Sequence, residues 1–237
     1  MISPRLKSLA TEYRYNAPIY YSAEVSRLVR ISTARVHRWL EGYNYSYESR
    51  LVSQPPVVKK EGEDILRSSY ASFNDLVDLL FIKHFLDYGL SLQKLRKALI
   101  EAEQILGTSH FIHRSFFTDG KNICLKIREK GDAILQLLSG GQWVIKKLIE
   151  QLAHQIDFDD ATKFARRWFP PEGDRLVVLD PLISFGKPTI WKKGITTENI
   201  FNLYVAEGEK EGPVCDWMGL ESREVLAAAK FESCLVA

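Results

Sequence analysis

Four residues near the start of the chain have the side chains and the spacing of a nucleic-acid-binding helix. In the segment 32–41 the apolar residues Val36, Trp39 and Leu40 recur at i, i+3 and i+4, which predicts a helix with one buried face. The polar residues of the other face are Thr33, Arg35, His37 and Arg38. Hydroxyl, imidazole and guanidinium groups bind base edges and phosphates. The sequence therefore predicts DNA contacts here, with an ordinary solvated helix face as the alternative.

A shorter helix is predicted immediately before this one, over residues 22–29. Ser22 can cap it, and Ile31 fills the corner between the two helices. Its apolar stripe consists of Ala23, Leu28 and Val29. Ser32 can cap the second helix, and Gly42 sits where a left-handed residue ends a helix at little cost. The two helices should pack together as a helix-turn-helix.

Alternating tyrosines follow the second helix, at the odd positions of 43–47. This period of two, ahead of the proline break at 55–56, predicts a strand pair, or wing, beside the helix. Arg50, Lys59 or Lys60 could reach phosphates from such a wing. A loop whose tyrosines only cover the core is the alternative.

The net charge of +2 hides an asymmetry along the chain. Residues 1–60 hold ten Lys and Arg against four Asp and Glu, a net charge of +6, so the remaining residues sum to −4. Excess positive charge on the segment with the helix-turn-helix pattern is what phosphate binding requires.

The middle of the chain is predicted to be mainly helical. A capping box at Ser72 opens a helix that continues through 76–88 and is apolar on nearly every side, so it should be central. The next helix, 92–106, carries a leucine seam that either packs on its neighbour or forms a coiled coil. A hairpin over 111–125, with an Asp-Gly turn, and a helix over 142–156 follow.

The last third of the chain has a different pattern. A proline-rich linker at 170–174 precedes a strand at 176–179, a glycine loop at 184–188 and three short helices. The main apolar residues of these helices are Ile200, Phe201, Tyr204, Val214, Trp217, Val225, Leu226, Ala229 and Phe231. Lys192 and Lys193 lie on a predicted turn, where they could bind a protein partner or simply be solvated.

No catalytic or metal-binding set can be assembled from the spacing. His110 and His113 have no Cys or carboxylate pair nearby to complete a zinc site. Asp157, Asp159 and Asp160 could hold Mg²⁺, but an isolated acidic cluster is typical of a solvated loop. We therefore expect no enzyme activity, no cofactor and no metal.

The composition is that of a soluble globular protein, 46% apolar and 26% charged. The longest apolar run, 79–82, is too short to cross a bilayer. Three scattered cysteines, Cys124, Cys215 and Cys234, predict a reduced, cytoplasmic protein without a membrane partner.

Two regions resemble known families. Residues 20–39, Phe73-Asn74-Asp75-Leu76-Val77 and the segment 89–96 (Gly-Leu-Ser-Leu-Gln-Lys-Leu-Arg) resemble the MerR-type winged helix-turn-helix. The C-terminal segment is similar to a small domain of VapB-like antitoxins, on the residues Asp180-Pro181, Phe185-Gly186-Lys187-Pro188, Gly194-Ile195-Thr196-Thr197, Gly208-Glu209, Trp217 and Val225-Leu226-Ala227-Ala228-Ala229. Phe185 stands where that domain usually has a small residue.

Together the resemblances imply a type II antitoxin. Such a protein neutralises a PIN-like ribonuclease toxin and represses its own operon, so the implied partners are the toxin and operator DNA. Because one short helix reads few base pairs, we also expect a homodimer. A MerR-like regulator that responds to a small molecule is the alternative function, and a protein-binding module that has lost DNA binding is a third.

The predicted fold is mainly α with small β elements. It comprises a MerR-like helix-turn-helix domain at 1–108, a middle segment at 109–172 with a hairpin and a helix, and a C-terminal three-helix domain at 173–237.

Overall fold

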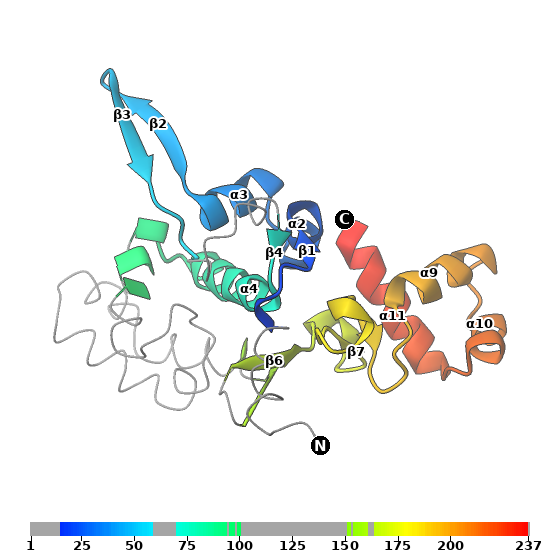
Figure 1. The fold of residues 1–237 in the computed structure, drawn as a ribbon. Coiled ribbons are helices and arrows are strands. Elements are labelled where there is room, and N and C mark those ends of the chain that lie inside the picture. Colours follow the sequence, from blue (N-terminus) through cyan, green and yellow to red (C-terminus); the bar gives the residue numbers. More distant parts are fainter. Residues whose placement is uncertain are drawn as a thin grey trace. The chain divides into compact units, whose positions relative to one another are not determined.

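The structure is a computed structural model that describes residues 15–58, 70–100, 151–160 and 164–236, apart from positions 94, 98 and 153. It is mainly helical with small antiparallel sheets of two strands each (Figure 1). The chain divides into two compact units. The first contains residues 1–154 and 158–165, and the second contains 155–157 and 166–237.

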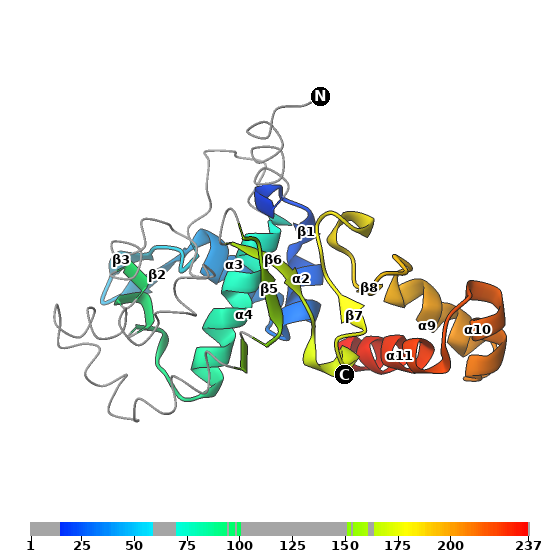
Figure 2. The same cartoon turned by 90° about the horizontal axis from the view of Figure 1, so that it is seen from below.

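Three helices form the core of the first unit. Helix α2 (Ser22–Val29) packs on α3 (Thr33–Glu41), and both pack on α4 (Phe73–Asp87), as two views show (Figures 1 and 2). The apolar residues that meet in this core are Val25, Leu28, Val29, Val36, Trp39, Leu40, Leu76, Val77, Leu79, Phe81 and Ile82, all buried. Strands β1 (Tyr20–Tyr21) and β4 (Tyr70–Ala71) pair antiparallel beside them.

The start of α4 is fixed by its sequence. The Asp75 amide donates to the Ser72 hydroxyl at 3.1 Å, and the Ser72 amide donates to the Asp75 carboxylate at 2.8 Å. This capping box satisfies two backbone donors that a buried helix end would otherwise leave unpaired. Both the box and the central position of α4 are confirmed.

The corner between α2 and α3 is closed by Ser26. Its carbonyl accepts the Ile31 amide at 3.2 Å, and its hydroxyl donates to the Ile31 carbonyl at 2.6 Å. Arg30 ends α2 in the left-handed region with φ 57°, and Ile31 is buried in the corner as predicted. These bonds set the direction in which α3 begins.

Two details of this helix pair were predicted wrongly. Helix α2 already begins at Ser22, so Tyr21 holds the N-cap position, without a side-chain cap bond. Ala23 is exposed, and Val25 takes its place in the core. The predicted hairpin at 111–125, His110, His113, Cys124, Lys59 and Lys60 lie outside the described residues. Residues 142–150 of the helix predicted at 142–156 also lie outside them, and that helix ends earlier than predicted, since Ile156 is in a strand.

A long hairpin follows α3. Strands β2 (Tyr43–Tyr47) and β3 (Arg50–Gln54) pair from Tyr43 opposite Gln54 to Tyr47 opposite Arg50. The hairpin extends away from the helices of its unit (Figure 1). Its two-residue loop, Glu48-Ser49, has positive φ at both positions, 47° and 64°. That geometry matches the twist of paired strands but normally selects Asn and Gly.

The second unit combines short strands with three helices. Its strands are β5 (Ile156–Phe158), β6 (Ala165–Trp168), β7 (Val177–Val178) and β8 (Thr189–Ile190), with β5 and Ala165 of β6 at the division between the units. Two 3-10 turns, η2 (Pro171–Gly173) and η3 (Ser184–Gly186), connect them. The helices are α9 (Thr197–Ala206), α10 (Glu211–Met218) and α11 (Ser222–Val236), of which α11 packs against both others.

The stretch at 170–174 is not a linker. Trp168, Phe169, Pro170 and Gly173 are buried, and η2 packs against α11. The Trp168 and Leu179 backbones exchange two hydrogen bonds, of 3.0 and 2.9 Å. Proline content favoured a linker, but here the prolines shape a turn inside the C-terminal unit.

The core of the second unit is small and mainly apolar, with Ile200, Val214 and Val225 fully buried. Two residues predicted for this core lie outside it, because Trp217 is 79% exposed and Leu226 is 45% exposed. Among the described residues, no helix is both long and apolar enough to cross a bilayer.

Candidate nucleic-acid interface

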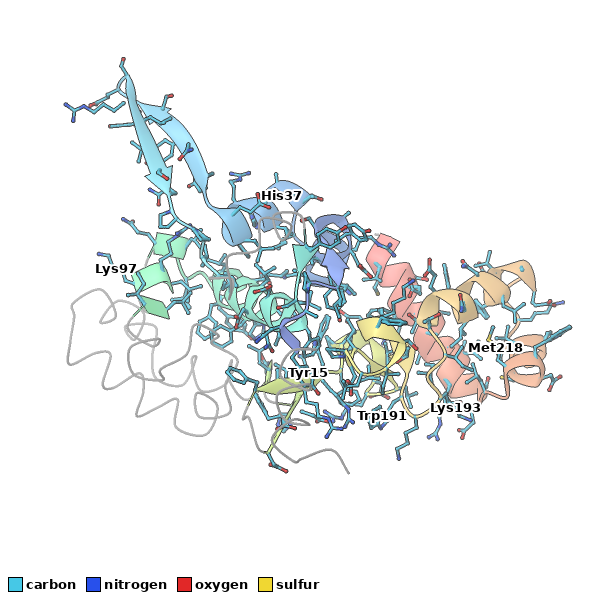
Figure 3. The ribbon with its side chains drawn as sticks, viewed as in Figure 1. Tyr15, His37, Lys97, Trp191, Lys193 and Met218 are labelled. Carbon is cyan, nitrogen blue, oxygen red and sulfur yellow. The ribbon has the colours of Figure 1, made fainter. Side chains whose placement is uncertain are left out.

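The outer face of α3 is polar and accessible. Thr33, Arg35 and Arg38 are exposed and His37 is half-buried, whereas Val36, Trp39 and Leu40 hold the opposite face in the core. Figure 3 shows His37 on the outer side of the helix. The structure therefore brings together the four helix residues that the sequence singles out, on a helix whose orientation is fixed by packing.

The two arginines of this face lie along aromatic rings. The guanidinium carbon of Arg35 is 5.7 Å from the centroid of Trp39, and that of Arg38 is 5.9 Å from the centroid of Tyr43. Arg38 also donates from Nε to the Ala34 carbonyl at 3.2 Å. These contacts restrict the rotamers of both side chains while leaving nitrogen donors exposed.

His37 has an acidic neighbour on the same helix. Its Nδ1 lies 3.2 Å from a carboxylate oxygen of Glu41, one helical turn away. Glu41 is thus the acidic residue that adjoins the basic face of α3. It is also at the C-terminal end of the helix, where the helix dipole disfavours negative charge.

The hairpin extends the polar face of α3. Residues directly opposite each other in an antiparallel pair share a face, so Tyr45, Tyr47, Val52 and Arg50 lie on the same side as Tyr43. All three tyrosines and Arg50 are exposed. The predicted strand pair is thus confirmed and the loop alternative is wrong, since these tyrosines do not cover a core.

Both ends of the hairpin are attached to the end of α3. Gly42 joins α3 to β2 with φ 78°, and a Cβ at this position would lie 2.4 Å from the Gln54 carbonyl oxygen. After β3, the amides of Val57 and Val58 both donate to the Trp39 carbonyl, at 2.7 and 3.0 Å. The hairpin therefore has a defined direction relative to the helix.

Arg96, from the segment after α4, contacts the same end of the hairpin. Its guanidinium donates to the carbonyls of Pro55 and Pro56 at 2.5 and 3.3 Å. Partial burial lowers the pKa of Arg96 below its usual value, but arginine remains charged at neutral pH. Sequence patterns gave no signal for this contact, because it joins positions forty residues apart.

The two lysines predicted to bind a partner have different surroundings. Lys192 is exposed, with φ 67°. Lys193 donates from Nζ to the Gly219 carbonyl at 3.1 Å and lies 4.0 Å from Glu224. Lys193 thus supplies a hydrogen bond to a backbone carbonyl at the C-terminal end of α10, within its own unit.

The first residue of the candidate acidic cluster is engaged with arginines. Asp157 is paired with Arg175 at 3.0 Å and lies 4.0 Å from Arg167. In the part of the chain that the structure describes, no three His, Cys, Asp or Glu residues group as metal ligands would.

No family model matches the chain. A Mycobacterium tuberculosis protein named "Putative antitoxin VapB45" is 26% identical over 206 residues, which cover 80% of this chain and 83% of that protein. The crystal structure of Rv2018 from Mycobacterium tuberculosis superposes with a TM-score of 0.73 at 22% identity, covering 91% of this chain and 99% of that chain. The second similarity establishes a common fold.

Proposed function

We propose that the chain is the antitoxin of a type II toxin–antitoxin system, which neutralises a PIN-like ribonuclease and represses its own operon. The similarity to a protein named as an antitoxin, over four-fifths of this chain, carries the first part. The exposed basic face of α3 carries the second. Both activities are stoichiometric binding and need no catalytic group.

The DNA-binding part is a MerR-like winged helix-turn-helix. Helix α3 enters the major groove with Thr33, Arg35, His37 and Arg38 toward bases and phosphates. The β2–β3 hairpin is the wing, and Arg50 near its tip contacts the backbone. Support comes from the packing of α2, α3 and α4 and from the attachment of the hairpin to the end of α3.

A two-fold dimer completes this proposal. Helix α3 has nine residues. At 1.5 Å per residue it is about 14 Å long, so it covers only a few base pairs. Two copies on half-sites of a palindrome double the interface and fix the spacing between the sites.

Neutralisation is tested by expressing the chain together with the product of the adjacent reading frame. We expect that product alone to arrest growth and degrade RNA, and the pair to grow normally and to co-purify. Growth arrest that persists at equal expression of the two proteins contradicts the antitoxin assignment.

DNA binding is tested with the operon's upstream sequence and the double variant Arg35→Ala/Arg38→Ala. If both side chains meet phosphates, the slope of log K against log salt falls by about two units. The double variant Arg223→Ala/Lys230→Ala, which removes the same charge from exposed positions of α11, is the control. Equal affinity of the first variant and the unchanged protein removes the assignment of α3.

A further inference from the structure

The two most exposed large apolar side chains among the described residues both belong to the second unit. Phe185 is 86% exposed and Trp217 is 79% exposed. An aromatic ring that stays in water gains none of the free energy that its burial would supply. Trp is among the residue types most enriched in interface hot spots. Neither ring contributes to the core of the second unit.

Phe185 is displayed by a strained but well-held turn. Ser184, Phe185 and Gly186 have consecutive positive φ values of 47°, 55° and 77°. The left-handed region suits Gly186 but is unfavourable for a phenylalanine. Hydrogen bonds from the Gly186 amide to the Ile183 carbonyl, 2.9 Å, and from the Lys187 amide to the Ser184 carbonyl, 3.1 Å, hold the turn. Strain that exposes an aromatic ring has no benefit for folding and indicates a contact with another molecule.

A chain of contacts connects this turn to the end of α10 that carries Trp217. The Ser184 hydroxyl donates to the Gly194 carbonyl at 3.0 Å. The preceding residue, Lys193, donates to the Gly219 carbonyl at 3.1 Å, two residues after Trp217. Figure 3 shows Lys193 and Met218 in the same region of the unit. The turn that carries Phe185 and the end of α10 that carries Trp217 are therefore joined through Lys193 and Gly194.

The charge of the connecting segment indicates the chemistry of its partner. Residues 181–197 contain three lysines, at 187, 192 and 193, and no acidic residue. Lys187 is 3.9 Å from Glu198 and Lys193 is engaged with α10, whereas Lys192 is exposed on the turn. Asp216 directly precedes Trp217 in α10, and Glu221 follows that helix in the sequence. A partner would thus place its carboxylates against the lysine turn rather than against α10.

We propose that Phe185 and Trp217 anchor the toxin, with both rings in apolar pockets of that protein and Lys187 and Lys192 facing its acidic groups. This inference rests on the proposed antitoxin function and specifies where the toxin binds. The lysines of this segment are complemented by a partner with acidic groups at the contact, and we assign that partner to the toxin.

The test measures binding of full-length variants to the product of the adjacent reading frame by calorimetry. We expect Phe185→Gly and Trp217→Ala each to weaken the complex at least about tenfold, and the double variant more. Phe185→Gly removes the ring and relieves the positive φ, so its melting temperature should equal or exceed that of the unchanged protein. Tyr47→Ala, which deletes an exposed ring of the hairpin, is the matched control and should bind the toxin normally.

Three results overturn the inference. If the unchanged protein does not bind, the antitoxin function itself fails. If it binds and both aromatic variants bind equally well, the function stands and this surface is wrong. If the variants instead convert a dimer of the isolated chain to monomers in sedimentation, while toxin affinity is retained, the rings belong to an interface between copies.

Discussion

At the scale of single residues, the side chains of α3 that we propose to face DNA are largely pre-positioned. Arg35 lies along Trp39, Arg38 along Tyr43, and His37 beside Glu41. Ordering a long side chain costs about 0.5–1.5 kcal/mol on binding. Because the rings already restrict both arginines, part of that cost is met during folding.

Glu41 is the residue whose removal should strengthen DNA binding. The Glu41→Gln variant abolishes a negative charge beside the basic face and releases His37 from its acidic partner. We expect a severalfold higher affinity for operator and unrelated DNA alike, since phosphate repulsion is independent of sequence. Fluorescence anisotropy at several salt concentrations measures it, with Glu221→Gln, on the second unit, as the control.

His84 makes the stability of the first unit dependent on pH. Burial lowers the pKa of His84 below its usual value, with Asp87 opposing and Lys83 adding to the effect. Among the described residues its Nε2 has no hydrogen-bond partner. The folded state therefore prefers the neutral ring, so its stabilisation is complete above about pH 6.5 and is lost as the pH falls through the lowered pKa.

Urea unfolding at pH 7 and pH 5 tests this dependence. We expect the unfolding free energy of the unchanged protein to fall over this range, and that of His84→Gln to fall less. Parallel losses in the unchanged protein and in His84→Gln would contradict the role of His84.

At the scale of elements, local sequence patterns predicted where the helices form better than they predicted which helix faces are covered by other elements. The spacing of Val36, Trp39 and Leu40 and the capping box of α4 are local signals, and the structure confirms them. Spacing failed for Trp217, which lies three residues from the buried Val214 and should point inward on period alone. A period assigns a face but cannot show whether another element covers it.

The turns were harder to predict for a different reason. Glu48-Ser49 forms a two-residue hairpin loop without the Asn or Gly that signals one, and 170–174 has the composition of a linker but is packed. In both cases contacts or pairing outweigh the local preference of the backbone.

Gly42 connects α3 to the hairpin and should tolerate no side chain. In the Gly42→Ala variant both the positive φ and the 2.4 Å approach to the Gln54 carbonyl become unfavourable. We expect a loss of about 2–4 kcal/mol in unfolding free energy, together with weaker DNA binding.

Gly89→Ala is the matched control for this prediction. Gly89 has φ 87°, but a Cβ there meets no atom within 4 Å. It should cost only the conformational term, about 1–2 kcal/mol. If the two variants lose the same stability in urea, the close approach of the hairpin base to Gly42 is not a constraint.

At the scale of the whole molecule, the C-terminal unit begins earlier than composition indicates. Asp180 is 1% exposed, and its carboxylate accepts Nε of Arg167 at 2.7 Å and the Leu182 amide at 2.8 Å. Arg167 in turn lies 4.4 Å from the centroid of Trp191. Strand β6 therefore supplies the charge partner of the second unit's buried carboxylate.

Two fragments test this boundary. A fragment of residues 155–237 retains Arg167, Trp168 and Phe169 and should unfold cooperatively. A fragment of residues 173–237 leaves Asp180 buried without its arginine, which costs about 3–5 kcal/mol of unfolding free energy. That loss is a large part of the total stability of so small a unit, so this fragment should not fold stably. Circular dichroism during heating distinguishes them, and equal melting temperatures would show that β6 is dispensable.

The hairpin has a consequence for the timing of recognition. The described residues cover it little, since every residue of β2 and three of the five in β3 are exposed, and its loop holds two residues in an unfavourable conformation. An uncovered strand pair is only marginally stable by itself. The β2–β3 hairpin should therefore open and re-form many times while helix α4 stays folded. The amide protons of the hairpin should exchange with solvent early. Contact with a DNA duplex would then select the form in which β2 and β3 are paired. Part of the binding free energy would be used to order the hairpin.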